Sequence, residues 1–182
     1  MMHRHFSHIQ INGKYNSDKR PVLLISNHFS WWDGFFMLYL NNRVFKKKYH
    51  VLMLEEQLKP RMFLNKAGAF SVKKGTRSVI ESIDYIKNIL SSPGNLVLIY
   101  PQGVIQSLYK FPFVFEKGIY NIIKNMDPGV RIFFAVALLD YFSQKKPSLN
   151  ISFKEYARDT GAENIEKAFN DFYSERTNAQ KP

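Results

Sequence analysis

The sequence contains no cysteine among its 182 residues. Disulfide bonds, a thiolate nucleophile and zinc sites built on cysteine are therefore excluded. Long apolar runs are absent too. The stretch Phe133–Leu139 falls far short of the roughly 20 residues that a membrane-spanning helix needs. The residues before Gly13 mix polar and aromatic types, without the apolar core of a signal peptide. We therefore expect a cytoplasmic protein whose membrane contact, if it has one, is peripheral.

Acidic residues are scarce, with 15 Asp and Glu against 26 Lys and Arg, which gives a net charge of +11. This excess favours an anionic partner, namely nucleic acid, an anionic bilayer, a phosphorylated substrate or an acidic carrier protein. Charge alone does not choose among them. The basic residues do not gather into a recognisable nucleic-acid-binding motif, so we expect no nucleic acid partner.

What is present is the composition of a folded domain, with 45% hydrophobic and 15% aromatic residues. No repeat, low-complexity tract or linker interrupts the chain, so one domain is expected over residues 1–182. Apolar runs and turn residues alternate along it. They predict strands at 6–11, 21–25, 51–54, 70–72, 96–100 and 132–139, a polar-alternating edge strand at 149–153, helices at 30–40, 57–66, 78–90 and 118–125, and an amphipathic terminal helix through Ile165, Phe169, Phe172 and Tyr173.

Alternating strands and helices, with central strands that are apolar on both faces, indicate an α/β fold. We expect a mixed, mostly parallel central sheet flanked by helices. The most unusual polar segments surround His28, Lys74 and Gln102, and each follows a predicted strand. Ligands of such folds gather beyond the carboxyl ends of the strands. The three segments are therefore expected to share one cleft.

His28 and Asp33 flank the predicted start of a helix. A carboxylate in the first helical turn can reach back to one imidazole nitrogen, which fixes the tautomer and leaves the other nitrogen to accept a proton. A second interpretation is open as well. Ser30 and Asp33 have the spacing of a capping box, in which the carboxylate satisfies only backbone amides.

The segment around this pair reads Asn27-His28-Phe29-Ser30-Trp31-Trp32-Asp33. It resembles the glycerolipid acyltransferase family, which includes lysophosphatidic acid acyltransferases and whose members carry an Asn-His-x-Ser-x-x-Asp signature. The resemblance implies that His28 is the general base and Asp33 its orienting partner, with Asn27 and Ser30 in support.

Further blocks follow in the order that the family has. In the second, Lys74 stands where an arginine usually contacts the acceptor's phosphate, and Arg77 follows closely. The resemblance implies that both residues, with Gln102 and Gly103 of the third block, bind the acceptor, and that Lys117 and Gly118 support them. The second block is 68–75, and the third is Tyr100-Pro101-Gln102-Gly103, followed by Phe115-Glu116-Lys117-Gly118. Val136-Ala137-Leu138 stands in the place of the fourth, valine-rich block, without its usual proline.

The third block departs from the family pattern. Gln102 replaces a glutamate and Ile105 occupies the usual position of an arginine. A lysine at Lys74 binds phosphate as a point charge and does not reproduce the bidentate arginine fork. Either Arg77, Lys110 or Lys117 compensates, or the acceptor is not a simple phosphate monoester. We favour an atypical acceptor.

The resemblance implies transfer of a fatty acyl group from an acyl thioester, carried by coenzyme A or acyl carrier protein, to a hydroxyl of a lysophospholipid or related lipid. No metal and no cofactor beyond this donor is expected. The implied partners are the lipid acceptor, the acyl donor and an anionic membrane surface at the inner face of the membrane. The alternatives are an acyltransferase for a phosphate-free acceptor and a catalytically degenerate lipid- or carrier-binding protein of the same fold.

Overall fold

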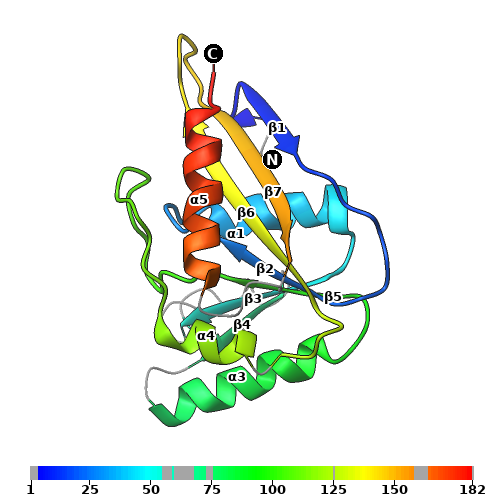
Figure 1. The fold of residues 1–182 in the computed structure, drawn as a ribbon. Coiled ribbons are helices and arrows are strands. Elements are labelled where there is room, and N and C mark those ends of the chain that lie inside the picture. Colours follow the sequence, from blue (N-terminus) through cyan, green and yellow to red (C-terminus); the bar gives the residue numbers. More distant parts are fainter. Residues whose placement is uncertain are drawn as a thin grey trace.

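The computed structural model describes residues 4–54, 59, 68–72, 76–124, 126–157 and 164–181. Within these ranges, strands and helices alternate along the chain, as the apolar runs predict (Figure 1). The strands are β1 (His8–Asn12), β2 (Val22–Ser26), β3 (Lys48–Leu54), β4 (Ala69–Val72), β5 (Asn95–Ile99), β6 (Arg131–Asp140) and β7 (Ser148–Tyr156), and the helices are α1 (Asp33–Leu40), α3 (Thr76–Leu90), α4 (Lys117–Lys124) and α5 (Ile165–Asn178), with a π-helical turn, η2 (Asn41–Phe45), after α1.

The strands form one sheet in the order β1-β7-β6-β2-β5-β3-β4. Neighbouring strands are parallel except for β6 and β7, which are antiparallel. The predicted α/β fold with a mixed, mostly parallel sheet is therefore confirmed. Strands β2 and β5 are adjacent near the centre, so the turns that follow them lie side by side.

The position predicted for one strand is wrong. Residues 149–153 were expected to form an edge strand, but β7 lies between β1 and β6. In β7, buried Leu149, Ile151 and Phe153 alternate with more polar residues. Such alternation indicates that the two faces of a strand differ in polarity. It does not indicate whether the strand has a neighbour on one side or on both.

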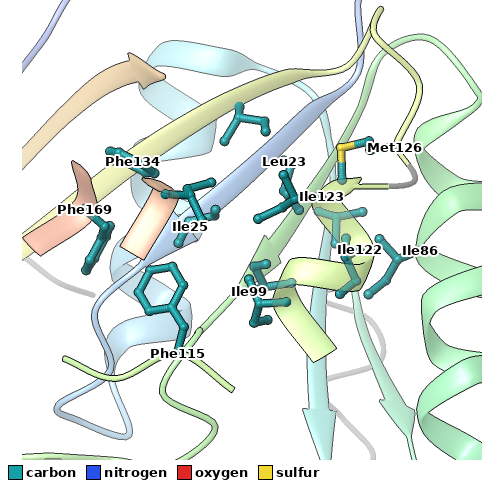
Figure 2. Packing of buried hydrophobic residues seen from close by; sticks show 14 of the residues in the cluster. Leu23, Ile25, Ile86, Ile99, Phe115, Ile122, Ile123, Met126, Phe134 and Phe169 are labelled. Carbon is teal, nitrogen blue, oxygen red and sulfur yellow. The ribbon is translucent and has the colours of Figure 1, made fainter. Parts of the chain in front are cut away.

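Helices cover both faces of the sheet. Leu23 and Ile25 of β2 pack in a cluster with α3, α4 and α5, whereas Val22 and Leu24 pack in a second cluster with α1 and η2. Figure 2 shows part of the first cluster, in which side chains from the sheet meet those of three helices. Because every residue of β2 is buried, this strand and the turn after it have a fixed position in the middle of the domain.

Several boundaries differ from those expected. Helix α1 begins at Asp33 rather than Ser30 and continues as η2, until Lys46 adopts a left-handed conformation with φ of 53°. Helix α3 begins at Thr76, two residues before the expected start at 78. The helix expected at 57–66 lies outside the described residues, apart from residue 59.

Candidate active site

The turn after β2 and the turn after β5 are joined by two hydrogen bonds. The side-chain Oε1 of Gln102 accepts the His28 N–H at 2.8 Å. In the other direction, the Gln106 N–H donates to the His28 carbonyl oxygen at 2.9 Å. Two of the three polar segments that were expected to share a cleft are therefore in contact.

His28 and Asp33 are in direct contact. The Nδ1 of His28 lies 2.8 Å from Oδ2 of Asp33. Because a carboxylate only accepts hydrogen bonds, Nδ1 carries the proton and the opposite nitrogen, Nε2, is the one that can accept another. The His28 side chain is 18% exposed, whereas that of Asp33 is fully buried. The imidazole is thus held from the protein side and reachable from outside.

The same carboxylate also organises the backbone. Oδ2 of Asp33 accepts the N–H groups of Phe29 at 2.7 Å and Ser30 at 2.8 Å. The Ser30 hydroxyl in turn accepts the Trp32 N–H at 3.2 Å. The bonds between Ser30 and the residues after it resemble a capping box. The two sequence-based interpretations of Asp33 are therefore compatible, since one oxygen caps the turn and holds the imidazole.

Burial governs the electrostatics of Asp33. Loss of solvent raises the pKa of the Asp33 carboxyl, and the hydrogen bonds from His28 and from the backbone N–H groups of Ser30 and Phe29 act in the opposite direction. Its other oxygen, Oδ1, is buried and has no hydrogen-bond partner among the described residues. Keeping a charge here therefore costs folding free energy. A neutral asparagine would cap the same turn at lower cost.

Tyr100 belongs to the site, although its role was not predicted. Its ring is stacked on the His28 imidazole, with centroids 4.1 Å apart and planes 16° from parallel. Burial raises the pKa of the Tyr100 hydroxyl well above its usual value, and Tyr49 and Asp33 add to the effect. The hydroxyl therefore stays neutral. The sequence feature that could have indicated this role is the position of Tyr100 directly after β5, at the aromatic position of the third block.

We expect the ring of Tyr100, and not its hydroxyl, to position His28. Tyr100→Phe keeps the stacked ring and should leave kcat near the wild-type value. Tyr100→Leu removes the stacking, worth about 0.5–1.5 kcal/mol for such pairs, and should lower kcat by about three- to tenfold. Steady-state kinetics of the two variants check this. An unchanged kcat and pH profile for Tyr100→Leu would show that the ring only fills space.

Asn27 fixes the turn from its other side. Its carboxamide donates to the carbonyl oxygen of Ala137 at 2.9 Å and accepts the Ala137 N–H at 2.9 Å. Asn27 is buried, and Ala137 lies in the valine-rich segment on β6. The residue before His28 is thereby clamped to a neighbouring strand. The first and fourth blocks, 110 residues apart, meet through this single side chain.

The third block packs against the residues that follow it. The Glu116 N–H donates to the Pro101 carbonyl oxygen at 2.8 Å, and the Gly103 N–H donates to the Tyr100 carbonyl oxygen at 3.1 Å. Gly103 has φ of +67°, and a Cβ added there would lie 3.0 Å from Cγ of Glu116. The left-handed backbone and this close approach together favour glycine here. Lys117 and Gly118 come next, as the first residues of α4.

Gln102 is oriented toward the protein. It is 3% exposed, its Oε1 is used by the His28 N–H, and its Nε2 is buried without a partner among the described residues. The structure gives Gln102 a positioning contact with the backbone of His28. Its predicted contact with the acceptor, like that of Gly103, stays a prediction.

Comparison with known families places these contacts in context. The acyltransferase family model matches residues 8–136. The chain belongs to the acyltransferase family. This is the family of glycerolipid and lysophosphatidic acid acyltransferases, so membership supports a general acyltransferase activity. The match includes the turn at His28 and Asp33, the third block and most of β6 up to Val136. No curated protein matches the sequence.

For two predicted residues of this acyltransferase, the described part of the chain does not include the side chain. Lys74 lies outside the described residues, and Arg77 lies in the first turn of α3. Their binding to an acceptor stays a prediction.

Across the described ranges, no helix is both long and apolar enough to cross a membrane.

Proposed function

We propose that this acyltransferase moves a fatty acyl group from an acyl thioester of coenzyme A or acyl carrier protein to a hydroxyl of a lysophospholipid or related lipid. His28 is the general base. The observation that carries the proposal is the 2.8 Å contact between His28 Nδ1 and Asp33 Oδ2, made by a partly exposed ring and a buried carboxylate. This arrangement leaves Nε2 of His28 available to the reacting hydroxyl.

In the proposed reaction, Nε2 of His28 takes the proton of the acceptor hydroxyl as its oxygen attacks the thioester carbonyl. Asp33 stabilises the imidazolium that forms. When the tetrahedral intermediate collapses, the carbon–sulfur bond breaks and the departing sulfur takes the proton from His28. The products are an ester and a free thiol. Neither a covalent acyl-enzyme nor a metal is needed, because the thioester is already activated.

A phosphate-free acceptor is the second candidate, and one position favours it. Ile105 stands at the usual arginine position and is 51% exposed, next to Gln106, which hydrogen-bonds to His28. An apolar side chain there offers no bidentate fork to a phosphate. Exposed cations remain nearby at Lys110 and Lys117. A lysophospholipid would therefore be held by point charges, and an acceptor such as monoacylglycerol would lose little by comparison.

Thiol release with paired acceptors tests the donor and the headgroup together. We expect release from acyl-CoA or acyl carrier protein, with lysophosphatidic acid and monoacylglycerol differing by less than about tenfold in kcat/KM. Ile105→Arg should raise kcat/KM for lysophosphatidic acid by about tenfold or more, because a charge-assisted hydrogen bond is worth about 1.5–3 kcal/mol, and leave monoacylglycerol unchanged. Without thiol release from any donor, the degenerate binding protein becomes the better description.

The proposal includes a peripheral position at the inner face of a membrane. Its support is the net charge of +11, since each Lys or Arg close to an anionic surface contributes about 1 kcal/mol. An acidic carrier protein would be attracted by the same charge.

A further inference from the structure

Exposed apolar side chains are concentrated at one end of the sheet, beyond the carboxyl ends of its parallel strands. Nine large ones are exposed in the described ranges, and all but Tyr85 follow the carboxyl ends of β2, β5 and β6. These three strands are adjacent and parallel, so their carboxyl ends point the same way. His28 follows the central one, β2. The carboxyl-terminal end of the parallel strands therefore carries both the proposed catalytic base and these exposed apolar side chains.

Most of these side chains lie on the loop 101–116, between β5 and α4. Tyr109 is 97% exposed and Val114 is 69% exposed. The loop is closed at its base by the bond from Glu116 to Pro101 and is tied to the catalytic turn through Gln106. In Figure 1 it is the green segment that extends from the sheet beside α5. The remaining exposed apolar residues of the loop are Val104, Ile105 and Phe111.

This loop is held firmly in its exposed position. Asn170 of α5 is bonded to both the N–H and the carbonyl oxygen of Phe113, each at 2.9 Å. The Tyr173 hydroxyl donates to the Leu108 carbonyl oxygen at 2.8 Å, and the Tyr173 ring stacks on Phe111. Buried polar groups thus fix the backbone, while the apolar side chains remain in contact with water. Such an arrangement suits a surface that is covered when the protein works.

A second loop, 141–147, adds exposed apolar residues at the same end of the sheet. Strand β6 continues from Ala135, the partner of the last residue of β2, to Asp140, about 16 Å further at roughly 3.3 Å per residue. Exposed Tyr141 and Phe142 follow directly. On the turn after β2, Trp31 is also exposed. Trp31, loop 101–116 and loop 141–147 together are called the apolar rim.

Positive charge accompanies the apolar rim. Lys145 and Lys146 are exposed beside Tyr141, and the 141–147 loop contains no acidic residue. Lys110 is exposed between Tyr109 and Phe111, and Glu116, at the base of the other loop, is its sole acidic residue. Aromatic side chains interleaved with lysines match the boundary between the acyl chains and the anionic headgroups of a bilayer.

We propose that the apolar rim docks on a lipid bilayer containing anionic lipids and thereby places His28 at the membrane surface. The inference rests on the proposed function in one respect, namely that a lipid acceptor must reach His28 from the bilayer. Tyr109, Val114 and Tyr141 enter the boundary between headgroups and acyl chains, and the lysines remain among the headgroups. Other occupants of the rim would be a second copy of the chain or an acidic carrier protein.

Vesicle binding tests the proposal without turnover. Trp31 and Trp32 are the two tryptophans of the chain, and both lie beside the catalytic turn. We expect wild-type protein to sediment with mixed phosphatidylcholine and phosphatidylglycerol vesicles, less so at high salt and less with pure phosphatidylcholine. Brominated lipids should quench the tryptophan fluorescence. The triple variant Tyr109→Ser/Val114→Ser/Tyr141→Ser should bind about tenfold or more weakly, because it loses the apolar area that enters the bilayer.

The matched control is Tyr85→Ser, which removes an exposed aromatic ring from α3, away from the apolar rim, and should bind as wild type. Three results would overturn the inference: triple-variant binding equal to wild type, vesicle binding without quenching, or binding to carrier protein or to a second copy in place of vesicles. Turnover of a short-chain monomeric acceptor separates this from the proposed function. If the triple variant keeps that turnover, the chemistry stands whatever the vesicle result; if wild type lacks it, the chemistry fails independently.

Discussion

His28→Ala is expected to lower kcat for acyl transfer by about 10³-fold or more, whereas the fold is retained. General base catalysis contributes typically about 10²–10⁴-fold, and His28 is the histidine in contact with the buried Asp33 carboxylate. Because the His28 side chain is partly exposed, its loss creates no enclosed cavity. Thiol release under saturating donor measures the effect, and circular dichroism measures the fold.

His8→Ala is the matched control, because His8 is an exposed histidine on β1, at the edge of the sheet. It should have wild-type kcat. Turnover by His28→Ala at the wild-type rate would rule out this histidine as the base, whatever the vesicle and acceptor experiments show.

The core of the fold is readable from the sequence, because it depends on local patterns. The continuous apolar runs that became β2 and β5 have no polar side to turn toward water, so a buried central position follows. The position of β7 does not follow in this way. Its pairing with β1 joins residues that lie far apart in the chain. The local sequence of either segment does not determine which strand it pairs with.

The same distinction holds within the site. His28 and Asp33 are five residues apart, so a helix start alone brings them together, and their contact was expected. The stacking of Tyr100 on His28 and the clamp from Asn27 to Ala137 need the finished sheet. Gln102 shows the limit most clearly. Its position in a motif predicts an acceptor contact, which stays a prediction, whereas the hydrogen bond of its Oε1 to the backbone of His28 was not predicted.

Asp33→Asn is expected to lower kcat by about 10³–10⁴-fold with little loss of stability. The amide keeps an oxygen for the N–H groups of Phe29 and Ser30 but removes the charge that stabilises an imidazolium at His28. Removing the charge also ends the cost of burying it, which offsets weaker hydrogen bonds. Steady-state kinetics and thermal unfolding at pH 7 compare the two effects on the same preparation.

The pH dependence of stability gives this variant a sharper test. Burial raises the pKa of Asp33, so the folded state favours its protonated form, and the stability contributed by this group is lost as pH rises through that pKa. The asparagine side chain of the variant does not titrate. Wild-type stability should therefore improve relative to Asp33→Asn as pH is lowered from neutral toward the raised pKa. A variant that is strongly destabilised at pH 7, with kcat per folded molecule unchanged, would reduce Asp33 to a cap.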